Sequence, residues 1–239
     1  LYPTTLLAQA ASCIGSKSSI NCGRAKNILG TFTPPNEVHI STDFLDTLEE
    51  HDVRSGVGEI LKVHAIDGPD SFDRLAGDYS RLFADKSVMI EYIRSALGIK
   101  IPFIQEDEFD RGSRNIFNYG HSFGHAIEAA TDFAIPHGLA VTMGCDMANF
   151  TSAELGIAGK NHFDRMHPTL KANYRNYENL AVPLEPFLAA LAKDKKNVGR
   201  GTVTLILPGA DGRVAKTTQQ ADDNFADICR NYFETARSA

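Results

Sequence analysis

The sequence feature that most constrains this chain is a group of three histidines in a region whose pattern predicts helices. The region reads Asn118-Tyr119-Gly120-His121-Ser122-Phe123-Gly124-His125-Ala126-Ile127-Glu128 and continues at Pro136-His137-Gly138. His121 and His125 are four residues apart, so a helix presents both on one face. Imidazoles from adjacent helices, joined by one carboxylate, form the three-ligand metal site with an open position that is typical of catalytic zinc. The alternative is that these are helix-capping or core histidines.

Composition and charge narrow the class of protein. The 239 residues are 43% hydrophobic and 23% charged, with a net charge of -6, so we expect a globular protein without a general nucleic-acid-binding surface. The four cysteines lack CxxC spacing, which favours reduced thiols in a cytoplasmic protein. No apolar run has membrane-spanning length, so we expect no membrane association. The chain does not begin with Met, and we expect its natural N-terminus to lie upstream.

The pattern along the chain predicts an α/β fragment followed by a mostly helical domain. Residues 1–50 are mixed in character, with a short strand expected at 37–40, and residues 51–239 are mainly helical. We expect helices near 53–66, 82–97 (closed by Gly98), 118–131 and 137–155, first helical turns at Pro168 and Pro186, a strand at 202–207, and a final helix carrying Phe225 to Phe233.

The carboxylate that the histidines require is predicted to be Glu59. It is flanked by Val57, Ile60 and Leu61, so we expect it to be partly buried, and a buried carboxylate needs a metal or a cation beside it. Lys62 follows one turn later, and the alternative interpretation is a Glu59–Lys62 pair at the surface. The residue pattern alone leaves both interpretations open.

Several basic residues are candidates for binding an anion. Gly15-Ser16-Lys17-Ser18-Ser19, followed by Lys26-Asn27, is similar to a phosphate-binding loop but lacks the first glycine of that motif, so a polar surface loop is the alternative. Lys100 and Arg114 precede Asn118, and Arg suits bidentate recognition of a carboxylate. Asp194-Lys195-Lys196 is, taken alone, typical of a solvated charged segment.

Together these blocks resemble the 3-dehydroquinate synthases and the wider sugar-phosphate cyclase family. The similarity runs in order from Tyr2 to about Pro208, and it includes Pro3-Thr4-Thr5-Leu6-Leu7-Ala8-Gln9, Lys26 to Phe32, Gly58-Glu59-Ile60-Leu61-Lys62, Gly112-Ser113-Arg114, the histidine region and Asp194-Lys195-Lys196. The resemblance implies an α/β multidomain family. Residues 1–50 would be the tail of its NAD-binding α/β domain, and residues 51–239 its helical metal- and substrate-binding C-terminal domain.

The resemblance also assigns roles to residues. It implies a metal, Zn2+ or Co2+, on Glu59, His121 and His137, with His125 nearby rather than a ligand. The catalytic residues would be Lys62, Lys100, Arg114, Asn118 and His125, with Lys100 and Arg114 near a substrate carboxylate. Lys17, Asn27, Asn118, Lys195 and Lys196 would surround a substrate phosphate. NAD would contact Thr4, Thr5, Lys17, Lys26, Phe44 and Thr47.

The reaction implied is that of a carbon–oxygen lyase. It converts 3-deoxy-D-arabino-heptulosonate 7-phosphate to 3-dehydroquinate and phosphate, in the shikimate pathway of aromatic amino-acid biosynthesis, with NAD as a transient hydride carrier. The partner would be a phosphorylated sugar acid, and we expect a homodimer. Three alternatives are another cyclase such as aminodehydroquinate synthase, a metal-dependent polyol or alcohol dehydrogenase, and a catalytically inactive helical module.

The chain departs from the family pattern at several positions. The glycine-rich N-terminal nucleotide-binding region has no counterpart, so we expect the isolated chain to bind NAD poorly and to lack activity. Ala11 stands where the family usually has Asp, and Asp110 stands where Glu is common. Ala11 has no side-chain group for a substrate hydroxyl. The precise sugar phosphate is therefore left open, although Lys100 and Arg114 together favour a carboxylated one.

Overall fold

The computed structural model describes residues 1–22, 25–193 and 201–238, with backbone alone for residues 21, 22 and 25–28. Its helices are α1 (Glu50–Asp67), α2 (Pro69–Asp78), α3 (Lys86–Glu106), α4 (His121–Ala130), α5 (His137–Glu154), α6 (Lys160–Tyr174), α7 (Leu184–Ala192) and α8 (Asp223–Glu234). Four strands form two antiparallel hairpins, β1 (Lys17–Cys22) with β2 (Ala25–Phe32) and β3 (Thr202–Pro208) with β4 (Val214–Gln220). The expected mostly helical architecture is confirmed.

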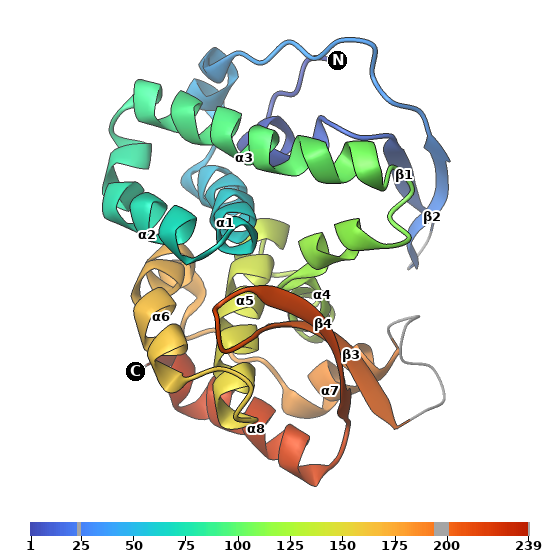
Figure 1. Ribbon diagram of the computed structural model, residues 1–239, viewed down its shortest axis with the longest axis vertical. Helices are drawn as coiled ribbons and strands as arrows, with labels where there is room; N and C mark the ends of the chain where they lie inside the picture. Colours follow the sequence, from blue (N-terminus) through green and yellow to red (C-terminus); the bar gives the residue numbers. More distant parts are fainter. Residues whose placement is uncertain (23–24, 194–200, 239) are drawn as a thin grey trace.

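Helix α5 forms the centre of the molecule (Figure 1). Every residue from Gly138 to Ser152 is buried, including polar Asp146 and Asn149. Helices α1, α4, α6 and α8 and strand β3 all pack against it. Because α5 is enclosed in this way, the residue that begins it, His137, has a fixed position relative to α1 and α4.

The two hairpins lie on different parts of this helical body (Figure 1). In the first, Lys17 pairs with Phe32 and Ile20 with Leu29, with an irregularity between Ile20 and Cys22. In the second, Thr202 pairs with Gln220 and Pro208 with Val214. Short helical turns complete the chain: a π-helical turn at Ala8–Ser12 and 3-10 turns at Thr42–Thr47, Tyr79–Phe83, Ser113–Asn118, Arg175–Tyr177 and Ala236–Ser238.

The structure corrects four local predictions. Residues 37–40 are extended but pair with no strand in the described part of the chain. Gly98 does not end a helix, because α3 continues through Gly98 and Pro102 to Glu106 while packing on α1. Pro168 lies in the middle of α6 rather than in its first turn. Residues from Lys17 onward form strand β1, so the segment read as either an anion-binding loop or a polar surface loop is a hairpin strand there.

The remaining predicted elements are confirmed, although the helix predicted at 118–131 begins at His121 and Leu82 lies in a 3-10 turn ahead of α3. Helix α1 ends at Gly68, which has a φ of 139°, and α5 is followed by Gly156 at a φ of 68°. Positive φ values of this kind favour glycine and stop the helix. Pro186 lies in the first turn of α7, strand β3 covers the predicted 202–207, and α8 is the predicted final helix.

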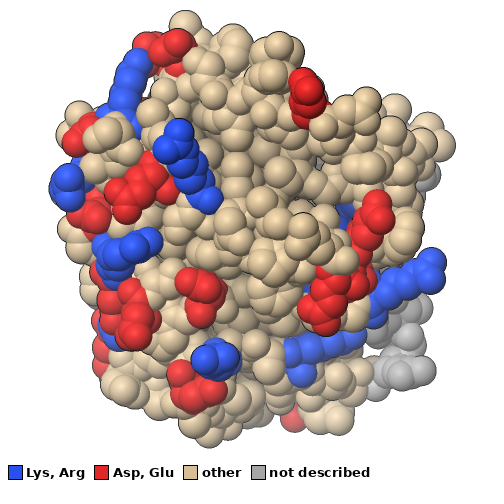
Figure 2. Space-filling view, turned by 45° about the horizontal axis from the view of Figure 1, so that its top comes forward, with Lys and Arg blue, Asp and Glu red and all other residues tan. Residues whose placement is uncertain are grey.

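Acidic and basic side chains are intermingled on the face shown in Figure 2, with a wide uncharged area between them. No single-sign field covers that face, which agrees with the net charge of -6. Among the described residues, no helix has both the length and the apolar character needed to cross a membrane.

Candidate metal and anion site

Three helices bring Glu59, His121 and His137 together. Glu59 lies in the middle of α1, whereas His121 and His137 are the first residues of α4 and α5. Gly120, with a left-handed φ of 74°, turns the chain into α4, and Pro136 precedes α5. A histidine at the start of a helix has its backbone fixed by the helix while its side chain extends beyond the helix end. The two helix starts therefore direct imidazoles towards the side of α1.

The ring nitrogens of His121, His125 and His137 offer ligand atoms within 4.8 Å of one another. Glu59 joins this group, because its Oε1 is 3.7 Å from His121 Nε2. His125 is the most exposed of the three histidines, and its ring is stacked beside His137 with centroids 5.6 Å apart. The structure therefore brings Glu59 and the three histidines to one place. The geometry by itself contains two possible triads, one with Glu59 and one with three histidines.

In both His121 and His137, the ring nitrogen Nδ1 has a hydrogen-bonding partner. His121 Nδ1 lies 3.3 Å from the carbonyl oxygen of Tyr119, and His137 Nδ1 lies 3.3 Å from Glu128 Oε1. In both rings, hydrogen bonding at Nδ1 leaves Nε2 to bind a ligand. Burial, with Lys62 adding to it, lowers the pKa of His121 well below the usual histidine value. The ring is thus neutral, as a metal ligand must be.

Glu59 is ionised although it is buried. Its side chain is 6% exposed, and its Oε2 accepts a hydrogen bond of 2.7 Å from Lys62 Nζ. Burial alone would raise the pKa of Glu59, but the positive charge of Lys62 and its hydrogen bond outweigh burial and lower it. The alternative interpretation predicted the Glu59–Lys62 pair correctly but placed it at the surface, whereas the pair is buried.

These residues fit a metal ion such as zinc. Within the described part of the chain, Glu59 Oε1 is buried and has no hydrogen-bond partner, an expensive arrangement unless a cation binds there. Two ligands about 2.0–2.2 Å from a tetrahedral zinc are about 3.4 Å apart, close to the 3.7 Å between Glu59 Oε1 and His121 Nε2. One carboxylate and neutral imidazoles are ligands that zinc and cobalt accept.

A pocket of about 220 Å³ opens beside this cluster. It is lined by Glu59, His121 and His137, by Lys62, and by four of the predicted anion-binding residues, namely Lys17, Lys100, Arg114 and Asn118. Four of these side chains are cationic, and Glu59 and Asp110 are the carboxylates that line the same space. The pocket therefore combines a candidate metal site with an excess of positive charge, a combination suited to an anionic ligand.

Lys100 is the most perturbed of these cations. It extends from α3, and its Nζ donates to the backbone carbonyl of Ala11. Burial lowers its pKa to about 8, with the positive charges of Lys62 and Arg114 adding to the effect. Ala11 thus contributes a carbonyl oxygen to the pocket wall, where its side chain offers no polar group.

Arg114 and Lys17 reach the pocket from different elements, the Ser113–Asn118 turn and strand β1. Arg114 Nη1 donates to the carbonyl of Glu108 at 2.7 Å, and a side chain on Gly15 would meet Arg114 Nη2 at 3.0 Å. Lys17 Nζ is 2.5 Å from Asp110 Oδ2. The first hairpin therefore contributes Lys17 to the pocket through an ion pair with the segment that precedes α4.

The structure does not bring every predicted residue to this pocket. Thr4, Thr5, Phe44 and Thr47, predicted to contact NAD, are exposed and do not line it. The side chains of Lys26 and Asn27 lie outside the described residues, as do Lys195 and Lys196 entirely. Sequence reasoning gave no role to Glu128, and its position in the helical repeat, seven residues after His121, was the available signal.

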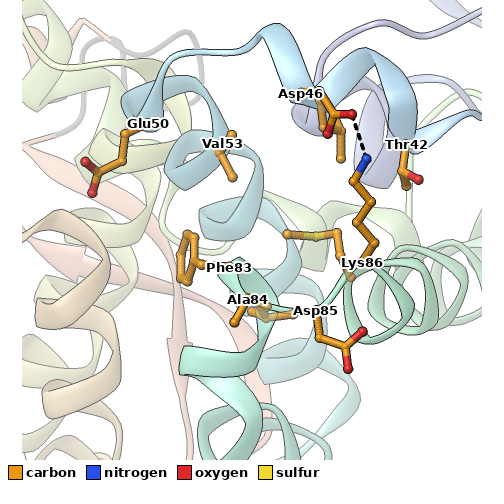
Figure 3. Close-up of a pocket in the computed structure, with 11 residues that line it drawn as sticks. Thr42, Asp46, Glu50, Val53, Phe83, Ala84, Asp85 and Lys86 are labelled. Atoms are coloured by element: carbon orange, nitrogen blue, oxygen red, sulfur yellow. Dashed lines mark hydrogen bonds and ion pairs between the residues drawn. The ribbon is translucent and has the colours of Figure 1, made fainter.

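A second pocket, of about 370 Å³, lies between the Thr42–Thr47 turn, α1 and the start of α3 (Figure 3). Val53 and Phe83 contribute apolar surface to its wall. Asp46 and Lys86 pair with each other at 2.7 Å. It is lined by no histidine, and it does not share the arrangement of the first pocket.

Comparison with known proteins agrees with this geometry. The 3-dehydroquinate synthase C-terminal family matches residues 56–197, and the 3-dehydroquinate synthase N-terminal family matches residues 1–55. The chain belongs to the 3-dehydroquinate synthase family. The boundary between the two matches falls within α1, which carries Glu59 just beyond it.

Curated relatives are of the same family. The chain is 34% identical to a 3-dehydroquinate synthase of Mesorhizobium japonicum over 245 residues, covering 99% of this chain and 65% of the relative. It is 35% identical to one of Brucella suis over 219 residues, covering 88% of this chain and 58% of the relative. The chain therefore spans less than two thirds of the length of these relatives.

Solved structures share the fold. A 2-epi-5-epi-valiolone synthase from Streptomyces hygroscopicus, with NAD+ and Zn2+ bound, superimposes with a TM-score of 0.82 at 24% identity, covering 96% of this chain and 64% of that one. A 2-deoxy-scyllo-inosose synthase complexed with carbaglucose-6-phosphate, NAD+ and Co2+ gives 0.82 at 22% identity, covering 97% and 65%. The helical arrangement of this 3-dehydroquinate synthase family member is thus that of sugar-phosphate cyclases.

Proposed function

We propose that this chain forms the metal- and substrate-binding part of a 3-dehydroquinate synthase that releases phosphate from 3-deoxy-D-arabino-heptulosonate 7-phosphate. The observation that carries the proposal is one pocket in which the unpartnered Oε1 of buried Glu59 faces His121, with Lys62, Lys100 and Arg114 around it. Metal-dependent elimination of an anionic group needs metal ligands and cations close together, and here both line one pocket. In this proposal residues 1–50 are the tail of the NAD-binding domain and residues 51–239 the helical domain.

Glu59, His121 and His137 would hold the metal, with His125 outside the ligand set. Glu59 is favoured over His125 because its Oε1 is buried without a partner, whereas His125 is exposed. A bound Zn2+ or Co2+ supplies Lewis-acid polarisation of substrate oxygens, and bound NAD carries a hydride away and back. The solved cyclases with NAD+ and Zn2+ or Co2+ support these cofactors.

The chain's own residues bind and orient the substrate. Arg114 and Lys100 suit its carboxylate, since a guanidinium presents a planar fork of donors and Lys100 adds a second charge. Lys17 and Asn118, with Asn27, Lys195 and Lys196 as predicted additions, suit the phosphate, and their charge stabilises phosphate as it leaves. Lys62 holds Glu59 Oε2 and leaves Oε1 for the metal. Lys26, Thr4, Thr5, Phe44 and Thr47 are proposed to contact NAD.

The cations favour this substrate over two alternatives. A polyol dehydrogenase has no need of Lys17, Lys62, Lys100 and Arg114 around one pocket. The solved 2-deoxy-scyllo-inosose synthase is complexed with carbaglucose-6-phosphate, a sugar phosphate without a carboxylate, whereas both Lys100 and Arg114 line this pocket and suit a carboxylate. An inactive helical module would not require the intact metal set. We also propose a homodimer, which sedimentation of the complete protein tests.

The reaction is tested by phosphate release. The complete product of the gene, supplied with NAD and Zn2+ or Co2+, is incubated with heptulosonate, sedoheptulose and amino-sugar phosphates, and inorganic phosphate is measured. We expect release from 3-deoxy-D-arabino-heptulosonate 7-phosphate without net formation of NADH. Release from sedoheptulose 7-phosphate or an amino-sugar phosphate alone would assign another cyclase, and NADH formation from a simple polyol would assign a dehydrogenase.

The metal set is tested separately. His137→Ala is expected to abolish stoichiometric zinc, measured by elemental analysis after dialysis, because one of three ligands is lost. His125→Ala is the matched control and is expected to retain zinc. Zinc retained by His137→Ala contradicts the assignment, and zinc lost from His125→Ala but kept by Glu59→Gln points to the three-histidine set.

A further inference from the structure

Glu128 is a buried carboxylate beside the candidate metal site that the proposed reaction does not use. It lies on α4 and is 3% exposed, and its Oε1 is 3.3 Å from His137 Nδ1. A carboxylate excluded from water at this depth is costly unless it bonds to a donor. The ring of His137, on the next helix, supplies that donor.

The turn between α4 and α5 fixes this contact. The carbonyl of Glu128 accepts from the backbone N–H of Phe133 at 2.8 Å. Asp132 and Phe133 both have a left-handed backbone, with φ values of 50° and 61°, which costs energy for residues other than glycine. The chain thus adopts a tight, strained turn that returns it from Glu128 to His137. This turn keeps the two side chains in register even though nine residues separate them.

The two helix-start histidines differ in what their Nδ1 atoms face. His121 Nδ1 lies beside the backbone carbonyl of Tyr119, a neutral acceptor, whereas His137 Nδ1 lies beside a carboxylate. A carboxylate that accepts from one ring nitrogen fixes the tautomer and increases the basicity of the other nitrogen. His137 is also the more exposed of the two, with its side chain at 35% compared with 17% for His121. The more solvent-accessible ligand therefore has the stronger anchor.

We propose that Glu128 is a positioning residue for the metal site. Its carboxylate accepts a hydrogen bond from the Nδ1–H of His137, holds the ring in the Nδ1–H tautomer and directs the lone pair of Nε2 towards Glu59 and His121. The proposal rests on the proposed function only in that it takes His137 to be a metal ligand. The pairing of Glu128 with His137 itself is independent of any metal.

The pairing is tested first on metal-free protein. Long-range 1H–15N spectra of the histidine rings, assigned with His137→Ala, report which ring nitrogen carries the proton. In the unmodified chain we expect His137 to be in the Nδ1–H form. In Glu128→Ala the preference is lost. In Glu128→Gln it is largely kept, because the amide oxygen still accepts a hydrogen bond from Nδ1–H. An unchanged tautomer in folded Glu128→Ala overturns the proposal.

Metal affinity tests the consequence of this pairing. Competition with a chromophoric chelator is expected to show Zn2+ and Co2+ bound about 10- to 100-fold more weakly by Glu128→Ala, with Glu128→Gln closer to the unmodified chain. Glu154→Ala, an exposed site at the end of α5, is the control for charge removal. Circular dichroism confirms that each variant is folded, and Glu128→Gln keeps the test valid should Glu128→Ala not fold.

Failure of this proposal and failure of the metal assignment give different results. Metal lost from His137→Ala but bound normally by Glu128→Ala and Glu128→Gln overturns the positioning role alone. Metal retained by His137→Ala overturns the ligand assignment and, with it, the role of Glu128.

Discussion

At the scale of single residues, Lys100 shows how its surroundings change the charge of a side chain. Burial lowers its pKa to about 8, and Lys62 and Arg114 add to the effect because they carry the same charge. A lysine with this pKa is charged below pH 8 and neutral above it. An anion bound in the pocket therefore loses one of its cationic partners as the pH rises.

Binding of sulfate, which stays doubly charged from pH 6 to 9, tests this effect. Between pH 7 and pH 9 the affinity of metal-free protein is expected to fall about tenfold, in proportion to the charged fraction of Lys100. Lys100→Arg keeps its charge through this range and is expected to show a much smaller change. Calorimetric or NMR titration gives the affinities. Equal pH dependence in the two proteins contradicts the assignment of the effect to Lys100.

Gly58 and Gly138 set the position of the site at the scale of secondary-structure elements. A Cβ on Gly58 would lie 2.3 Å from the carbonyl oxygen of Gly138, and a Cβ on Gly138 would lie 1.9 Å from the carbonyl oxygen of Ser55. The N–H of Gly138 also donates a hydrogen bond of 2.9 Å to Ser55 Oγ. Helices α1 and α5 therefore touch backbone to backbone, next to Glu59 and His137. The glycines are required by this close approach.

Gly58→Ala is accordingly expected to push α1 from α5. The added methyl group overpacks the contact, and we expect a loss of about 1–3 kcal/mol in the free energy of unfolding, measured by urea denaturation. Zinc affinity is expected to fall as well, because Glu59 moves with α1. Gly77→Ala on α2, where an added Cβ meets nothing within 4 Å, is the control. If Gly58→Ala is destabilised but its zinc affinity is unchanged, the α1–α5 contact stabilises the fold without positioning Glu59, and this prediction is wrong.

At the scale of the whole molecule, Asp146 connects the central helix to the C-terminal part of the chain. It is fully buried on α5 and accepts hydrogen bonds from Tyr174 at 2.7 Å and Tyr232 at 2.9 Å, with His167 Nδ1 also at 2.9 Å. One carboxylate thereby ties α5 to α6 and α8. Burial, followed by the charge of Asp146, raises the pKa of both tyrosines far above the usual value, so they remain donors.

Asp146→Ala is expected to destabilise the fold by about 3–5 kcal/mol, since it leaves several buried donors without an acceptor. Chemical denaturation measures the loss, and exposed Asp164→Ala on α6 serves as the control. His137, in the candidate metal site, begins α5 nine residues before Asp146, which is about 13 Å along the helix. We therefore expect the folded fraction of Asp146→Ala to retain stoichiometric zinc, and loss of zinc from folded protein would contradict this separation.

The sequence by itself determined the helical class of the chain and predicted the residues of the candidate metal site. Apolar periodicity and the glycines at 68 and 156 gave the positions of α1 and α5, because both signals are local. The order of the family-like motifs singled out Glu59, His121 and His137, as well as Lys100 and Arg114. The structure brings these five residues to one pocket. Local signals misled at Gly98 and Pro168, where packing against neighbouring helices kept α3 and α6 continuous.

Tertiary structure alone decided what surrounds those residues. That Glu59 and Lys62 are a buried pair, that Lys100 meets the carbonyl of Ala11, and that Glu128 reaches His137 all depend on contacts between elements. Burial and the charges of neighbours set the state of each ionisable group, and neither is a property of a local stretch of sequence. The chain's residue types thus specify which chemistry is available, and the close packing of α1, α4 and α5 specifies where it is assembled.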